Sequence, residues 1–283
     1  MTTQLENYLN EFETLEVSER DDASYQRLHY LTDRLLDRDP HEVTPFFIDL
    51  LNKEKYLTSQ GFADLRLPHI LKILKSSNDE SCLPYLIQLA GDQRVSYYLK
   101  DICYAIGHFK TESSRQFLKA HLNIPQLASH CAILLAHFPD PSGEPILLNS
   151  FRESLARENF SSDIFIALTC LQNHRMWMDL EAYLRKPISE RERYKVCSTL
   201  MSLDHSRIIP SLIQCYRYYS LHNDIDYSDA KAISLEGESM ILTKAHKDSI
   251  PFSEKMCQRI LNKLKLYHSD FRVKALIKRK SFV

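Results

Sequence analysis

The sequence predicts an all-α protein in which helical pairs stack into a right-handed α-α superhelix. Three observations lead to this fold class. Glycine is scarce, with 5 among 283 residues, whereas doubly wound sheets, phosphate-binding loops and β-sandwiches need glycine at turns of special backbone geometry. Leu, Lys, Glu, Gln and Ala, which favour helices, are plentiful. A break followed by an apolar run recurs about every thirty-two residues, as expected of stacked supersecondary units.

The repeat is clearest when the chain is aligned on the start of each apolar run. The anchor residues are Pro45, Pro84, Gln116, Pro145, Met178 and Pro210. A proline suits the first turn of a helix because its missing N–H would have no partner there. Each unit is therefore predicted to hold two helices, the first beginning near the anchor. About six such pairs are expected, with atypical units capping both ends.

The stretch 94–109 shows how the second helix of a pair is recognised. Its apolar residues follow helical spacing, and they are Val95, Tyr98, Leu99, Ile102, Ala105, Ile106 and Phe109. Small residues recur where two helices must approach closely, at Gly107, Ala136 and Ser202. One pair cannot cover its own apolar stripe, so neighbouring pairs are expected to share a continuous core.

Two segments, CLPYLIQLAGDQRVSYYLKDICYAIGHF and HCAILLAHFPDPSGEPILLNSF, resemble HEAT-like repeats of the short kind named after phycobilin lyases. That family's pattern is Pro-x-Leu-Ile-x-Leu, an acidic turn, Val-Arg and then Ala-Leu-Gly. The resemblance extends from about Thr44 to Tyr216. It departs from the pattern around Trp177, where no proline marks the anchor, and at Arg94-Val95, where the order is inverted. It implies a HEAT-like repeat solenoid but no single function, because adaptors, lyases, hydroxylases and DNA glycosylases share such repeats.

The predicted organisation has four parts: N-terminal capping helices at 1–38, HEAT-like helical repeats at 39–216, an irregular connection at 217–250 and basic C-terminal capping helices at 251–283. The first cap is marked by the stripe Leu5, Leu9, Phe12 and Leu15, and the last by Met256, Ile260, Leu261 and Leu264. The basic residues of the tail either favour the dipole at a helix C-terminus or contact an acidic partner, a nucleic acid or the acidic first helix.

Composition and motifs set limits on function. The 36 basic and 37 acidic residues nearly balance, which argues against a dedicated nucleic-acid binder. The seven cysteines include no CxxC pair, which predicts reduced thiols and a cytoplasmic location. No signal peptide and no membrane-length apolar run is present in the sequence. Walker A, GxGxxG, GxSxG, HExxH and zinc-finger spacings are absent too, so we expect no catalysis, cofactor or metal.

The resemblance implies that the second helix of each pair lines a concave side. The predicted partner-binding residues are Arg94, Tyr97, Asp101, Tyr104 and His108, with His69 and Lys72 before them and Gln126, His130, His137, Arg191 and Lys195 after them. Tyr, Arg and His make good anchors at protein interfaces. The alternative is an ordinary solvated helix face. Two exposed tyrosines, Tyr97 and Tyr104, favour the groove, because a purely solvating face would carry Glu and Lys instead.

The predicted function is therefore a non-enzymatic protein-binding solenoid, in the form of a bacterial immunity or antitoxin protein or of an adaptor. The alternative is a HEAT-like-repeat DNA glycosylase or another nucleic-acid-binding protein, with Asp101 between two tyrosines and with Arg94 and Lys100 meeting phosphate. Two observations count against it. Trp177 falls on a first helix, where it is expected to be core, and the inner stripes mix charges of both signs, whereas duplex DNA requires a positive track.

Overall fold

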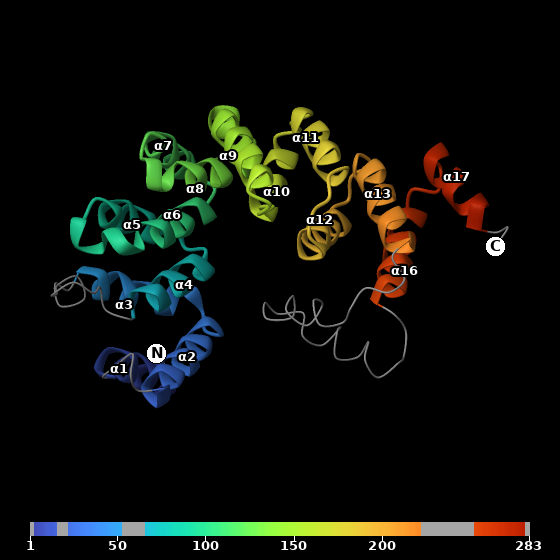
Figure 1. Cartoon of the computed structure of the whole chain (residues 1–283). Coiled ribbons are helices and arrows are strands. Elements are labelled where there is room, and N and C mark those ends of the chain that lie inside the picture. Colours follow the sequence, from blue (N-terminus) through green and yellow to red (C-terminus); the bar gives the residue numbers. More distant parts are fainter. Residues whose placement is uncertain (1–2, 16–21, 53–65, 222–251, 281–283) are drawn as a thin grey trace. The chain divides into compact units, whose positions relative to one another are not determined.

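The computed structural model describes residues 3–15, 22–52, 66–221 and 252–280, which are built from helices and their connections (Figure 1). No strand occurs within these ranges, and the all-α prediction is confirmed. The chain divides into two compact units, unit 1 (Met1–Ile146) and unit 2 (Leu147–Val283). The superhelical arrangement and the four-part organisation stay predictions.

Unit 1 is made of helical pairs. Its helices are α1 (Thr3–Thr14), α2 (Asp22–Leu36), α3 (Pro40–Asn52), α4 (Leu67–Ser77), α5 (Leu83–Ala90), α6 (Leu99–His108), α7 (Glu112–Ala120) and α8 (Pro125–Ala136). Among the described residues, three short 3-10 helices follow α4, α5 and α8: η2 (Glu80–Cys82), η3 (Gln93–Tyr98) and η4 (Pro141–Gly143). Each odd-numbered α-helix packs on the even-numbered one that follows it, and α2, α4, α6 and α8 pack on one another in that order. We call these four helices the second-helix layer.

The core of unit 1 follows the predicted apolar stripes. Leu5, Leu9 and Phe12 of α1 are buried, and the Phe12 ring meets that of Phe47 edge to face, with centroids 5.1 Å apart. Burying one such side chain contributes about 1.5–3 kcal/mol. The predicted stripe at the start of the chain is confirmed, and it joins α1 to α3 as well as to α2.

Prolines mark some helix starts as predicted. Pro84 and Pro145 lie in the first turns of α5 and α9, and Pro210 is the third residue of α13. The prediction is wrong at Pro45, because α3 already begins at Pro40 and Pro45 lies inside it. There the sequence has two prolines five residues apart, and the helix begins at the first.

The continuous helix predicted over 94–108 is also wrong. Residues Gln93–Tyr98 form η3, Val95 has φ −105° and ψ 16°, and α6 begins only at Leu99. The Asp92 side chain accepts a hydrogen bond from the Arg94 N–H at 2.9 Å, which caps the 3-10 turn. The three-residue spacing of Val95 and Tyr98 buries both side chains on a 3-10 helix as well as on an α-helix.

Two glycines allow close helix contacts in unit 1. A Cβ on Gly107 would lie 3.0 Å from the Leu134 side chain, and one on Gly143 would lie 2.5 Å from the Ala132 Cβ. The predicted role of Gly107 at a close approach is confirmed. Ala136 is likewise buried, whereas Ser202 is exposed at the end of its helix, so the prediction for Ser202 is wrong.

Unit 2 contains α9 (Glu144–Ala156) from Leu147 onward, then α10 (Ser162–Cys170), α11 (Arg175–Leu184), α12 (Glu190–Ser202), α13 (Ile208–Leu221), α16 (Phe252–Lys265) and α17 (Phe271–Lys280). α10 packs on α12, α11 on α13, and α13 also on α12 and α16. Aromatic rings connect its core, with Phe165 5.9 Å from Phe151 and 5.1 Å from Trp177. Trp177 is buried, which confirms its predicted place in the core.

The C-terminal region agrees in part with its prediction. α13 continues to Leu221, into the stretch predicted to be irregular, and the remainder of that stretch lies outside the described residues. Met256, Ile260, Leu261 and Leu264 are buried on one face of α16, as predicted. Six of the seven cysteines are buried thiols and Cys170 is exposed. Within the described ranges, no helix has both the length and the apolar character that crossing a membrane requires.

Candidate functional site

Aromatic and histidine side chains gather where α2 and α4 meet in the second-helix layer. The Tyr25 and His29 rings of α2 lie edge to face, with centroids 4.7 Å apart, and His29 lies equally close to His69 of α4. Tyr25 also faces His69 at 6.1 Å. Tyr25 is 43% exposed and His29 is exposed, so the cluster opens to solvent along α2.

His69 does not lie where the sequence analysis expected it. It is 6% exposed, and its Nδ1 is 2.8 Å from the Thr32 hydroxyl. Burial, together with the nearby His29 and the Lys72 cation, lowers the pKa of His69 to about 4. The prediction of an exposed groove residue is therefore wrong. The Tyr25 and His29 rings cover His69, so it supports the surface from beneath.

Lys72 lies one turn after His69 and is exposed, as predicted. Its Nζ is 3.2 Å from Asp33 Oδ1 on α2, so Lys72 and Asp33 form an ion pair between α4 and α2. Exposed pairs of this kind stabilise a protein by less than about 1 kcal/mol. The pair thus leaves both groups available to a partner.

α6 carries Asp101 and His108 on its exposed side, as predicted. Partial burial together with the Lys75 and Lys110 cations lowers the pKa of His108, which places His108 near the end of α4. Tyr104 is half-buried rather than exposed, because it packs against the small apolar cluster of α6 and α8. Its ring lies 5.8 Å from that of His130 on α8, which is also half-buried.

Arg94 and Tyr97 lie on η3 and not on the helix that carries Asp101. The Arg94 guanidinium hydrogen-bonds both carboxylate oxygens of Asp92, at 2.6–3.1 Å, so its charge is already paired. Tyr97 is 87% exposed, with only the Tyr98 ring close to its own, at 5.2 Å, among the ring contacts of the described residues. Tyr97 is the clearest exposed anchor that the sequence analysis identified.

The remaining predicted residues are distributed over both units. Gln126 and His137 are exposed at opposite ends of α8. Arg191 and Lys195 lie on α12 in unit 2, where Arg191 is exposed and Lys195 is half-buried with its Nζ 3.2 Å from Glu192 Oε1. No site is assembled here from residues of the two units together.

These contacts define one surface within unit 1, which we call the second-helix face. It consists of Tyr25, His29, Lys72, Tyr104, His108 and His130 on the four helices, and we include Tyr97 of η3, two residues before the start of α6. Ring contacts join α2 to α4 and α6 to α8, and α4 packs on α6. Tyr25 and His29 were not predicted as site residues, because residues 1–38 were interpreted only as a cap. Their spacing of four residues on one helix was the available signal.

No group of three or more His, Cys, Asp or Glu residues that could hold a metal ion occurs among the described residues. Comparison of the chain with protein-family models, with curated proteins and with solved structures returned no match. The function is therefore argued from the side chains of the second-helix face.

Proposed function

We propose that the chain is a non-enzymatic, protein-binding repeat protein whose helical pairs form a HEAT-like solenoid, and that unit 1 holds its partner on the second-helix face. The two concrete forms are a bacterial immunity or antitoxin protein and an adaptor. One observation carries the proposal: tyrosines and histidines are solvent-accessible on α2, α6 and α8 of one layer, and Lys72 is exposed on α4 between them.

The composition of this face supports a protein partner. Tyrosine is enriched at the centres of protein interfaces, because it offers a large contact area and a hydroxyl at a small entropic cost. Tyr25 and Tyr97 are exposed, whereas Tyr104 of α6 and His130 of α8 are half-buried. The charges on the face are balanced by pairing, as between Lys72 and Asp33. Such a face has no continuous positive track for a nucleic acid.

The stacking of the second helices supports the solenoid part of the proposal. α2, α4, α6 and α8 pack in sequence order, and each odd-numbered helix covers one of them from outside the layer. Repeats of this kind present extended surfaces on which several helices contribute to a single partner contact.

The test is quantitative co-purification from the native host, with the wild-type chain and matched variants as bait. Tyr97→Ala removes an 87% exposed side chain and is expected to weaken capture of the partner by about tenfold if Tyr97 is an anchor. Tyr85→Ala is the control, because Tyr85 is 37% exposed on α5, outside the second-helix layer. A protein lost with Tyr97→Ala and Tyr25→Ala but retained with Tyr85→Ala supports the proposal.

Two results would count against it. Equal capture by all the variants would remove the second-helix face as the binding site. Binding of duplex DNA that falls steeply with added salt and is lost with Tyr97→Ala would favour the DNA glycosylase or nucleic-acid alternative instead.

A further inference from the structure

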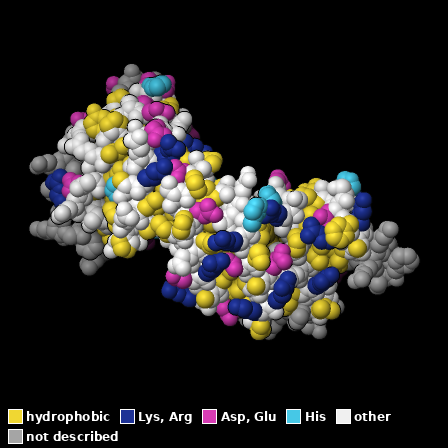
Figure 2. All heavy atoms as spheres, turned by 90° about the horizontal axis from the view of Figure 1, so that it is seen from above, with side chains coloured by type: hydrophobic (Ala, Val, Ile, Leu, Met, Phe, Trp, Pro, Cys, Tyr) yellow, Lys and Arg dark blue, Asp and Glu magenta, His cyan; other side chains and the backbone are white. Residues whose placement is uncertain are grey.

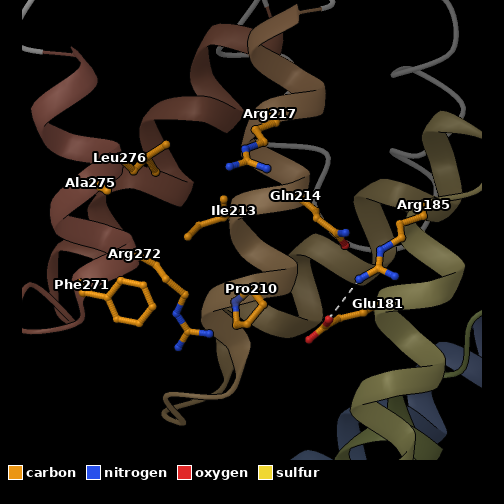
Figure 3. Close-up of a pocket in the computed structure, with 10 residues that line it drawn as sticks. All are labelled: Glu181, Arg185, Pro210, Ile213, Gln214, Arg217, Phe271, Arg272, Ala275 and Leu276. Carbon is orange, nitrogen blue, oxygen red and sulfur yellow. Dashed lines mark ion pairs between the residues drawn. The ribbon is translucent and has the colours of Figure 1, made fainter.

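Unit 2 contains a cleft of about 510 Å³ between α11, α13 and α17 (Figure 3). Phe271 and Arg272 extend from α17 toward α13, and Glu181 and Arg185 approach from α11 on the other side. Gln214 lies between these walls on α13. Clefts of several hundred Å³ are the size that encloses a small ligand or a few residues of a peptide.

Three arginines line the cleft against one glutamate. Arg185 is 3.7 Å from Glu181, and Arg272 hydrogen-bonds both carboxylate oxygens of Asp270, at 3.0 and 2.8 Å. Arg217 is exposed, and its guanidinium makes no hydrogen bond or ion pair within the described part of the chain. A guanidinium has five N–H donors in a planar fork that matches a carboxylate. The cleft therefore carries more positive than negative side chains, and one of its arginines has no charge partner in the described part of the chain.

The surroundings of the cleft strengthen this charge. Residues 147–283 contain 22 Lys and Arg but 16 Asp and Glu, although the whole chain is nearly neutral. Figure 2 shows Lys and Arg side chains spread among hydrophobic ones on the face of unit 2 that it presents. Such a field attracts anionic partners and speeds their encounter.

The cleft is also apolar. Phe271 is 76% exposed at its edge, and Ile213 and Leu276 line its interior. Apolar side chains within a charged rim are typical of a recognition groove. A nucleic-acid backbone would gain little from them, whereas a peptide that alternates acidic and apolar residues would use both features.

Gln214 adds a third feature. Its Oε1 is buried and has no hydrogen-bond partner among the described residues. A buried amide oxygen without a donor is unfavourable, and a peptide main chain supplies N–H donors at regular spacing. Phosphates and carboxylates offer acceptors only, so this oxygen favours a ligand with N–H donors, such as a peptide main chain, over a free phosphate or a phosphate backbone.

We propose that this cleft binds an acidic linear peptide segment of a partner protein. Arg217, with Arg185 beside it, receives a carboxylate; Phe271 and Leu276 receive an apolar side chain; and Gln214 accepts a main-chain N–H. The site lies in unit 2 and does not depend on the function proposed for unit 1.

The test measures fluorescence anisotropy of a labelled peptide, Glu-Glu-Leu-Phe-Glu-Glu, with the full-length chain. Arg217→Gln is expected to weaken binding by about tenfold, because it removes a charge-assisted hydrogen bond. Arg157→Gln is the matched control, since it makes the same change of net charge at an exposed site directly after the end of α9. Phe271→Ser tests the apolar part, and Trp177 fluorescence shows whether each variant remains folded.

Weaker binding with Arg217→Gln and Phe271→Ser, but not with Arg157→Gln, supports the proposal, as does loss of binding when every glutamate of the peptide is replaced by glutamine. Three results overturn it. The first is absence of peptide binding to the wild-type chain, and the second is equal weakening of binding by Arg217→Gln and Arg157→Gln. The third is displacement of the labelled peptide by a DNA duplex at a lower concentration than by unlabelled peptide. None of these outcomes depends on Tyr97→Ala, so the proposal for unit 1 is judged separately.

Discussion

The imidazole of His69 and the hydroxyl of Thr32 form a buried hydrogen bond, 2.8 Å long, between α4 and α2. The Thr32 hydroxyl also donates to the Leu28 main-chain oxygen at 2.7 Å. A hydroxyl has a single proton, so Thr32 accepts from His69, and the neutral ring carries its proton on Nδ1. A second proton would place a charge in a buried site between two helices, beside Lys72.

This arrangement predicts that unit 1 loses stability in mild acid. The folded-state pKa of His69 is about 4, below its usual value of 6.5, so the unfolded chain binds the proton more readily. The stabilisation is complete above pH 6.5 and decreases as the pH falls toward 4. Uptake of this one proton by the unfolded chain is expected to lower the free energy of unfolding by about 2 kcal/mol between pH 7.5 and 5.

Urea unfolding followed by circular dichroism checks this prediction, with His69→Asn as the comparison. Asparagine cannot take up a proton, and its amide can still donate to Thr32, so the stability of the variant should change less over the same pH range. Trp177, the single tryptophan, lies in unit 2, and its fluorescence serves as an internal control. Parallel pH curves for the wild type and the variant would contradict the assigned role of His69.

Much of the fold could be predicted from the spacing of apolar residues. Ile102 and Ile106 of α6 are buried as predicted, as are Met256 and Ile260 of α16, because helical periodicity depends only on local sequence. The interruption at η3 was not predicted, since a 3-10 turn and an α-helix bury residues three apart equally well. The cap by Asp92 was the available local signal.

The candidate sites were less predictable, because they depend on neighbouring helices. His69 was expected to face solvent, yet the rings of α2 bury it. Five aliphatic residues of α4 are buried beside it, and their number in so short a helix was a sign that α4 is enclosed on more than one side. The cleft of unit 2 brings Arg185, Arg217 and Arg272 together from three helices, a proximity that sequence spacing does not reveal.

Gly143→Ala is expected to destabilise unit 1. The new Cβ would lie 2.5 Å from the Ala132 Cβ and 2.7 Å from its Cα, so η4 and α8 would have to separate. Overpacking of this kind costs about 1–3 kcal/mol. Hydrogen exchange of the α8 amides measures the loss directly.

Ala132→Gly provides the matching control for that substitution. On its own it weakens α8 by about 1 kcal/mol, the helix-propensity cost of glycine. Combined with Gly143→Ala it removes one of the two clashing atoms, so the double variant should lose less stability than the two single losses together. A strictly additive loss would show that the two positions do not press on each other.

Asp140 is expected to stabilise unit 1 through its charge. It is 4% exposed, its carboxylate is 2.7 Å from Lys119 Nζ, and it accepts hydrogen bonds from the N–H and hydroxyl of Ser142 at 3.0 and 2.6 Å. Burial alone would raise its pKa, but Lys119 and Ser142 outweigh burial and hold the pKa at about 2.

Asp140→Asn should therefore lower the free energy of unfolding by about 2 kcal/mol at pH 7. The folded pKa lies below the usual 3.8, so this contribution is present above pH 4 and is lost as the pH falls toward 2. Urea unfolding at pH 7 and at pH 3 measures the change, and Lys119→Met completes a double-mutant cycle. Independent effects of the two substitutions would contradict the ion pair.

Glu192 is expected to be the most sensitive charged residue of unit 2. It is 4% exposed, its Oε2 accepts from the Phe160 N–H at 2.6 Å and from the Tyr183 hydroxyl at 3.4 Å, and its Oε1 pairs with Lys195. Burial and the Glu192 charge raise the pKa of Tyr183, which keeps that hydroxyl protonated as a donor. The carboxylate thus joins the start of α10 to α11 and α12.

Glu192→Ala leaves the Phe160 N–H and the Tyr183 hydroxyl without their acceptor and should cost about 2–3 kcal/mol, measured by urea unfolding with Trp177 fluorescence. Glu192→Gln keeps an acceptor for the Phe160 N–H and removes only the pairing with Lys195, so its cost should stay within about 1 kcal/mol. Glu153→Gln, at an exposed site on α9, controls for the loss of one negative charge. Equal losses for Glu192→Ala and Glu192→Gln would mean that the charge, and not the accepted hydrogen bonds, holds these helices together.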